Sequence, residues 1–413
     1  MWETIKRNAK KKIYLFIEKD GLVVMLSFVI LIILVAIAFC QKAEITDVVD
    51  LTVFSGIVFA MALNVLSKVF KKSILNRFED DVKLTTEYKK LCKKYQTDLY
   101  CYKNQDGKSV CFPVAQFMPL KGCQIEIRDT DRMYQLPETI QEHFDEIFSA
   151  HQTSKIYNRL HVRVDDWGKE GNTFYLSTSR TTYYNSMVTN RAMDFPWENG
   201  LTVREALEYG PFLHDLSTSE LSNHLGFNGF IMSNDNQIPL IKRDDDLSIG
   251  KKTCGASINA ALNTEHALEK DGTFQSQGLV ATILHKIEDE LKISSTDLKT
   301  FDLNKNLIAV YRDLVEGGKP QLLFYVECHL DRKDIEKKFY QALGKNYWVK
   351  RKAGSDPLED GSKILWIKKE ELHSVYLDVD KMIHNNKKYE MTPSAAASFG
   401  MFIDVILEEN GGK

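Results

Sequence analysis

The sequence lacks a strong excess of charge, and its cysteines are few and widely spaced. Its 413 residues carry 54 lysines and arginines against 57 acidic residues, a formal net charge of -3. That balance argues against non-specific binding of nucleic acid polymers, which needs a cationic field. The seven cysteines are odd in number, and no two have CxxC spacing. A disulfide framework or a structural zinc site is therefore not indicated, and a reducing compartment fits better.

Glycine and proline are also sparse, with 22 and nine residues, and no internal repeat or low-complexity tract interrupts the chain. At 44% hydrophobic and 27% charged residues, the composition is that of a folded protein with a sizeable core. The length favours two to three domains. Residues 100–413 are expected to fold compactly.

Two apolar runs near the N-terminus predict a membrane hairpin. Residues 22–40 carry no charge, and as a helix they would span about 28 Å, close to the thickness of a bilayer core. Residues 51–66 form a shorter second run. A cleaved signal peptide is the alternative for the first run, but an A-x-A-like cleavage site is missing and a second run follows at once. We therefore expect a basic segment at 1–21 and a two-span hairpin at 22–70.

Lysine and arginine flank the hairpin on both outer sides, whereas the link between the runs is mostly acidic. This distribution predicts that both termini face the cytoplasm. In the second run, Gly56 and Ala60 permit close helix contact, and Asn64 needs a polar partner in lipid. The contact is either within the hairpin or between chains. Since two spans cannot enclose a pore, membrane damage would require an oligomer.

Residues 71–98 show apolar positions mostly three and four apart, which predicts an amphipathic connector helix. It either continues the second span as a stalk or lies against its own domain. Beyond it, segments 111–117, 124–128, 160–164 and 173–177 have strand patterns, and residues 138–150 a helical one.

Further along, hairpins are expected at 227–242 and 307–330, a short helix at 219–224, a longer helix at 279–291 and a C-terminal helix. The predicted fold class is α+β: a two-helix transmembrane hairpin followed by an α/β/α domain over 99–413, with its core at about 220–413 and an N-terminal extension before it.

The 279–291 helix ends in a run that is similar to a known motif. Residues 285–293 read HKIEDELKI. This run resembles the Nudix box of the Nudix hydrolases, R-E-U-x-E-E-x-G-U, whose glutamates hold divalent cations on one helix face. Asp289 and Glu290 retain acidity, but Lys286 stands at the first metal glutamate and Lys292 at the glycine. A lysine among the ligands opposes a metal, so we expect neither a metal nor another cofactor. The remaining acids could equally be an ordinary solvated face.

Upstream strings extend the resemblance: residues 181–192, 201–207 and 222–226 look like the leader of a Nudix subgroup. With the predicted spans, the chain resembles the membrane-anchored NUDIX effectors of bacterial CBASS antiphage systems. The resemblance covers about residues 150–413 by strings. It implies a multi-pass protein of the bacterial inner membrane and a cyclic oligonucleotide ligand made by a cGAS/DncV-like nucleotidyltransferase. It further implies homo-oligomers that damage the lipid bilayer and kill the infected cell.

A cyclic oligonucleotide needs fixed cations for its phosphates and flat rings for its bases. The candidate ligand-binding residues lie near strand ends or beside the expected cleft: Arg180, Tyr184, Asn190, Arg191, Lys242, Arg243, Tyr311 and Arg312. No catalytic residue is predicted. Two alternatives stay open: a tethered Nudix hydrolase acting on a nucleoside diphosphate derivative or dinucleotide, and a scaffold without a ligand.

Overall fold

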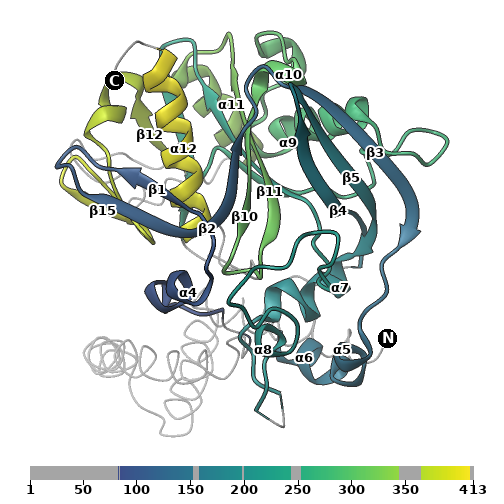
Figure 1. Cartoon of the computed structure of the whole chain (residues 1–413). Coiled ribbons are helices and arrows are strands. Elements are labelled where there is room, and N and C mark those ends of the chain that lie inside the picture. The colour runs from purple at the N-terminus through teal and green to yellow at the C-terminus, as the bar shows by residue number, and fades with distance from the viewer. Residues whose placement is uncertain are drawn as a thin grey trace, which may run out of the picture. The chain divides into compact units, whose positions relative to one another are not determined.

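The computed structural model describes residue 82 and residues 84–151, 158–197, 200–242, 253–343 and 364–409. Over these residues the protein is mixed α/β, with strands gathered in four sheets (Figure 1). The largest is a six-stranded sheet whose strands lie in the order β1 (Leu99–Lys103), β2 (Ser109–Pro119), β10 (Leu307–Asp313), β11 (Lys319–Glu327), β6 (Gly226–Met232) and β9 (Ile258–Ala261). Its pairs are antiparallel except for β11 and β6, which run parallel.

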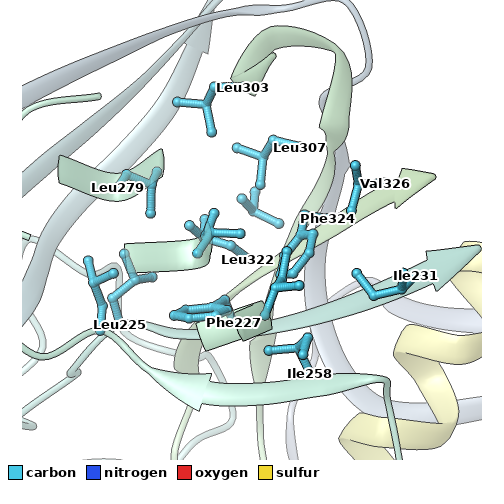
Figure 2. Packing of buried hydrophobic residues seen from close by; sticks show 14 of the residues in the cluster. Leu225, Phe227, Ile231, Ile258, Leu279, Leu303, Leu307, Leu322, Phe324 and Val326 are labelled. Atoms are coloured by element: carbon cyan, nitrogen blue, oxygen red, sulfur yellow. The ribbon is translucent and has the colours of Figure 1, made fainter. Parts of the chain in front are cut away.

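Helices cover both faces of the six-stranded sheet. Alternate residues of β11 belong to different cores: Leu322 and Phe324 pack with α9 (Ser276–Leu291), and Leu323 packs with α12 (Pro393–Glu409). This alternation follows from the two-residue period of a strand. Figure 2 shows the α9 side, where Leu279, Leu322 and Phe227 belong to one buried cluster. Because both faces are covered, every residue of β6 and β10 is buried.

The α9 helix presents an apolar stripe with a spacing of four: Leu279, Ile283, Ile287 and Leu291 are all fully buried. Removing one such side chain from water contributes roughly 1.5–3 kcal/mol. The helix ends at Lys292, which adopts φ 60° and donates its backbone N–H to the carbonyl of Glu288. A left-handed residue at this position satisfies an orphan carbonyl and turns the chain away.

The three smaller sheets each have three strands. The first joins β3 (Gln124–Met133), β5 (Thr173–Thr182) and β4 (Leu160–Glu170); the second joins β12 (Ile364–Lys368), β7 (Gln237–Lys242) and β8 (Cys254–Gly255); the third joins β13 (Tyr376–Asp378), β14 (Lys381–His384) and β15 (Lys387–Glu390). The start of β4 also bonds to the residues next to two strands of the six-stranded sheet. The backbone N–H of Val162 donates to the carbonyl of Leu262, just after β9, and the carbonyl of Val162 accepts from the N–H of Leu225, just before β6. We call this junction the seam.

Short helices complete the described part. They are α4 (Tyr88–Lys94), α5 (Glu138–Glu142), α6 (Phe144–Ala150), α7 (Tyr183–Val188), α8 (Val203–Leu207), α10 (Leu303–Asn306) and α11 (Arg332–Leu343). The α8 helix begins with a capping box, in which Thr202 and Glu205 satisfy each other's backbone N–H groups. Nearby, the 3₁₀ turn Asn190–Ala192 follows α7 and leads towards the seam.

Several predicted elements are confirmed. The four strand segments fall within β2, β3, β4 and β5; the helix at 279–291 is α9, and the second hairpin is the antiparallel pair of β10 and β11. The first hairpin is wrong in its pairing. Its turn exists, with Ser233 donating to Gln237, but β6 and β7 then enter different sheets. The β6 strand pairs with β11 and β9, and β7 pairs with β12 and β8, which local turn chemistry could not show.

Two helix predictions fail. Residues 219–224 form an irregular segment with one bend and one bridge instead of a helix, because Ser222 and Asn223 bond to Thr189 and Asn190 across the chain. The connector at 71–98 is helical only over α4 among its described residues, and Leu84 to Glu87 are not helical. The residue before α4, Glu87, offers no side-chain cap.

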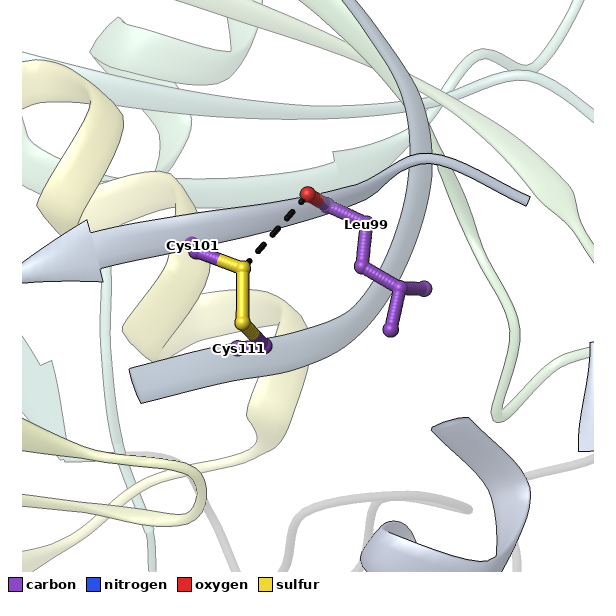
Figure 3. The surroundings of a disulfide bond; sticks show 3 residues. All are labelled: Leu99, Cys101 and Cys111. Carbon is purple, nitrogen blue, oxygen red and sulfur yellow. Dashed lines mark hydrogen bonds between the residues drawn. A yellow bond between two sulfur atoms is a disulfide. The ribbon is translucent and has the colours of Figure 1, made fainter. Parts of the chain in front are cut away.

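The expectation of unpaired cysteines is also corrected. Cys101 and Cys111 form a disulfide between directly paired residues of β1 and β2 (Figure 3). The free cysteines within the described ranges are Cys92, Cys123, Cys254 and Cys328. Strand register brings the two bonded cysteines together, and their spacing of ten residues gave no indication of it.

The predicted fold class is wrong: the described residues form a mixed α/β arrangement with several sheets, and no transmembrane hairpin is seen among them. Within the part of the chain that the structure describes, no helix is long and apolar enough to cross a membrane. The segments 22–40 and 51–66, with Gly56, Ala60 and Asn64, lie outside the described residues. A two-span inner-membrane localisation is therefore unsupported and forms no part of the function proposed below.

Candidate functional site

Arg180 lies on β5 and is engaged by an acid. Its two terminal nitrogens donate to the two carboxylate oxygens of Asp129, at 2.7 and 2.6 Å, and one of them also donates to the carbonyl of Gly272. Both Arg180 and Asp129 are buried or nearly so. The forked pair joins β3, β5 and the loop before α9, so this guanidinium supports the fold rather than an open surface.

Tyr311 and Arg312 are neighbours on β10 and point to opposite faces. The Tyr311 hydroxyl lies among Asn228 and Ser394, at 2.6 and 3.1 Å, beneath α12. Arg312 donates to the carbonyls of Gly318 and His214, at 2.7 and 2.5 Å. Neither side chain is exposed. Burial lowers the pKa of Arg312 to about 10, so it stays charged at neutral pH.

The other predicted ligand residues lie apart from one another. Tyr184 is half-buried on α7, with its ring 4.6 Å from that of Phe148. Lys242 ends β7, in a different sheet, and is half-buried there. Arg243 lies outside the described residues. The structure therefore does not assemble the predicted set into one pocket.

Asn190 and Arg191 are placed at the seam. The buried amide of Asn190 donates to the carbonyl of Glu316 and accepts from the backbone N–H of Asn223, both at 2.9 Å. It thereby ties the 3₁₀ turn to the β10–β11 turn and to the strand leading into β6. Arg191 is half-buried, and its guanidinium carbon lies 5.8 Å from the ring centre of Tyr183.

Three residues that the sequence analysis did not select complete this site: His161 on β4, His224 just before β6, and Lys319 at the start of β11. The two imidazole rings are 5.6 Å apart. The parallel register that pairs Gln321 with Gly226 places Lys319 level with His224. Together with Arg191, these residues form what we call the seam cluster. All but Arg191 are buried.

The groups of the seam cluster create a positive electrostatic potential around His224. The pKa of His224 is held well below its usual value by burial first and then by Lys319, His161 and Arg191. Burial likewise lowers the pKa of His161 to about 4. Both rings are thus neutral at pH 7, in surroundings that repel a further positive charge.

One buried acid balances one cation. Lys319 donates to the carboxylate of Glu316 at 3.2 Å, and burial lowers the lysine's pKa despite this partner. Behind them, burial and the charge of Glu316 raise the pKa of Asp313, which therefore compensates less of the positive charge than its formal count suggests.

His224 is the least satisfied group of the seam cluster. Within the described residues, neither ring nitrogen has a hydrogen-bond partner, and the side chain is fully buried. Buried polar atoms are normally paired, and leaving one unpaired costs about 1–3 kcal/mol. An imidazole in this state beside two cations fits a ligand rich in acceptor oxygens.

An open pocket adjoins the seam cluster. It has a volume of ≈ 310 Å³ and is lined by Arg159, Leu160, Asn263, Thr264 and Glu265. His161 follows Leu160 on β4 and forms a bridge with Asn263. The Nδ1 of His161 lies 3.0 Å from the carbonyl of Arg159, so that nitrogen carries the proton. Polar and charged side chains thus surround a space at the lower end of the range for small-ligand sites.

The acids of the predicted Nudix box are arranged differently. Asp289 lies 3.4 Å from Lys286 and 4.0 Å from Lys292, on the exposed face of α9. Glu290 turns towards β9, where it accepts from the backbone N–H of Asn259 at 3.4 Å. Across the described part of the chain, no three histidine, cysteine or acidic side chains converge as a metal site would require.

The seam cluster escaped the sequence analysis because its members come from four separate segments. His224 falls within the segment 222–226, for which only a resemblance was noted, and Lys319 falls within the hairpin expected at 307–330. Only their shared position at strand starts could have suggested that they meet. Comparison with known proteins adds no further assignment: no family model matches the chain, and no curated protein matches it.

Proposed function

We propose that this domain is a receptor for an anionic nucleotide of the cyclic oligonucleotide class, acting as the sensor of an antiphage effector. One observation carries the proposal: buried His224 has no partner for either ring nitrogen within the described residues, while Lys319, Arg191 and His161 surround it. A phosphodiester offers acceptor oxygens to the unpaired imidazole and a negative charge to the cations beside it, of which Lys319 is balanced in part by Glu316.

Side chains that could contact the base and the ribose of a nucleotide also lie near the seam cluster. Tyr183 presents a half-buried ring beside Arg191, and aromatic rings stack on bases for roughly 1–3 kcal/mol each. The adjoining pocket offers the amide of Asn263 and the paired charges of Arg159 and Glu265, which are 2.6 Å apart. Such groups suit the polar edge of a base or a ribose.

Binding, rather than hydrolysis, is the activity that this arrangement favours. Lys292 keeps a left-handed conformation at the position where the Nudix box has glycine, which supports the resemblance of the helix end. Yet Lys286 occupies the first metal position and bonds to Asp289, an acid that would otherwise bind the cation. A lysine ammonium at that place repels a divalent ion.

The proposed partners follow from the resemblance. A cGAS/DncV-like nucleotidyltransferase would make the messenger, and a second copy of the chain would associate with the first after binding. In the structure, the seam joins two sheets and the 3₁₀ turn, so an anion held there would contact several elements at once. That geometry is suited to converting binding into a change of assembly.

Calorimetry on the full chain tests the proposal, with a panel of cyclic di- and trinucleotides as titrants. We expect at least one to bind, and Arg191→Gln to weaken that binding about tenfold or more, the usual cost of losing a charge-assisted bond to phosphate. Lys305→Gln is the matched control, because Lys305 is exposed and pairs with Asp302 far from the seam. Absence of binding across the panel, or equal losses in both variants, would refute the proposal.

A further inference from the structure

His224 is held in a fixed position with unused bonding capacity. Its backbone forms an antiparallel bridge with Arg163 of β4, and its side chain is fully buried. Arg163 itself is engaged by Asp165 and by the carbonyls of Ser219 and Leu221. A neutral imidazole has one donor and one acceptor nitrogen. An anion that only accepts hydrogen bonds can use the donor, whereas the acceptor nitrogen would face it unfavourably.

Three charged or titratable groups act on His224: His161 from β4, Arg191 from the 3₁₀ turn and Lys319 from β11. Arg163 of β4 bridges the backbone of His224, and Glu316 and Asp313 act on the neighbouring Lys319. Glu316 is bonded to Lys319, and Arg163 to Asp165. In the absence of an anion, this arrangement keeps the imidazole neutral. A bound anion would reverse the sign of the local potential.

A row of rings links the half-buried rim to His224. Tyr183 lies 5.8 Å from His161, which lies 5.6 Å from His224. Exposure falls along this row, since Tyr183 is half-buried, His161 is 4% exposed and His224 is 0% exposed. The row therefore places His161 between the half-buried ring of Tyr183 and the buried imidazole of His224.

We propose that the seam cluster takes up one proton when it binds its anion, and that His224 is the group that receives it. A solvent proton adds to the bare ring nitrogen, so both nitrogens of the imidazolium carry a proton and neither presents a lone pair to the anion, and no bond of the ligand is made or broken. This inference rests on the proposed nucleotide binding and specifies its regulation: acidification tightens the complex.

The direction of the pH dependence follows from linkage. Free His224 has a pKa well below 6.5, and a bound anion raises it. Between the two values, the complex holds one more proton than its separated parts. The association constant then falls up to tenfold for each unit by which the pH rises, and it levels off above the pKa of the complex.

The experiment measures proton uptake directly in the unaltered full chain. The cyclic dinucleotides and, in parallel, sulfate are titrated at pH 5.5 to 8.5 in two buffers with different ionisation enthalpies. Neither kind of probe titrates in this range, so a buffer-dependent heat reports protons that the protein binds. We expect uptake of about 0.5–1 proton for each anion bound near pH 6, declining towards pH 8.5.

Variants then locate the proton. His224→Gln should abolish the uptake while a weaker, pH-independent binding persists; His373→Gln, at an exposed histidine, should leave the uptake unchanged. Binding of either probe by the wild type without proton uptake overturns this inference and leaves the proposed function standing. Failure of every probe to bind overturns both. Proton uptake that survives in His224→Gln overturns the assignment of the proton to His224. This outcome is read from the uptake alone, without comparing the stabilities of the variants.

Discussion

The exposed end of α9 and the seam cluster both gather charged side chains, but their surroundings differ. On α9, Asp289 is 53% exposed and lies between two lysines, so solvent and neighbours already satisfy it. At the seam, His224 and Lys319 are buried, and the former has no hydrogen-bond partner within the described residues. Exposed charges contribute little and need no ligand, whereas buried donors without acceptors favour one.

The difference also separates motif from site. The Nudix-like run was singled out because its residue types match a known pattern. In the structure, however, Asp289 bonds to Lys286, and Glu290 accepts from the backbone N–H of Asn259. The seam cluster matches no pattern, because its members come from β4, the segment just before β6, the start of β11 and a 3₁₀ turn. Charge alone therefore does not identify a site; burial and unsatisfied bonding do.

The largest expected effect comes from a buried arginine outside the seam cluster. Arg312→Ala removes a guanidinium that bonds to the carbonyls of Gly318 and His214 and leaves buried Glu208 without its nearby charge. We expect the free energy of unfolding to fall by about 3–5 kcal/mol. Denaturant unfolding measures it. A loss below about 1 kcal/mol would show that the guanidinium is available to other partners.

Arg191 provides the comparison for this prediction. It is half-buried beside Tyr183, so Arg191→Gln should lower the free energy of unfolding by only about 1 kcal/mol while weakening nucleotide binding. Equal losses of stability in the Arg191 and Arg312 variants would remove the distinction between a ligand-binding and a structural arginine.

Strand and helix positions could be predicted where periodicity is strong. The helix expected at 279–291 is α9, and the hairpin expected at 307–330 is the antiparallel pair of β10 and β11. Pairing between distant segments could not be predicted in this way. The β6 strand joins β11 in parallel and β9 beyond it, although its nearest strand in sequence is β7.

The candidate site was predictable only in part. Asn190 and Arg191, which the sequence singled out as candidates, lie at the seam, but Arg180 and Tyr311 were not expected to be buried among Asp129, Asn228 and Ser394. Sequence pattern does not report which cation already has a carboxylate partner. It also cannot show that His161 and His224 approach each other from positions more than sixty residues apart.

An intermediate effect is expected at Asp313, the acid behind the seam cluster. Its pKa is raised in the folded protein, so the native state binds a proton more tightly than the unfolded chain does. The free energy of unfolding should therefore fall as the pH rises from about 4 towards the raised value, at up to about 1.4 kcal/mol per unit.

Asp313→Asn should remove this slope, because the amide keeps an oxygen that can accept from the N–H of Val315. The variant should be more stable than the wild type at pH 8, by about 1–2 kcal/mol, and the two should converge near pH 4. Urea unfolding at a series of pH values measures the difference. Parallel pH profiles would mean that Asp313 is charged in the native state and that the seam is less positive than inferred.

The smallest effects should come from α9. Asp289→Asn removes two exposed contacts with lysines, so the free energy of unfolding should change by about 0.5 kcal/mol or less, and nucleotide affinity should not change. The same variant tests the hydrolase alternative. If nucleoside diphosphate derivatives are turned over in the presence of Mn²⁺, and if Asp289→Asn and Glu290→Gln both abolish that turnover, then the acids of α9 hold a catalytic ion despite Lys286. Because Lys286 already bonds to Asp289 and Glu290 faces Asn259, we expect no turnover above the rate of a heat-inactivated sample.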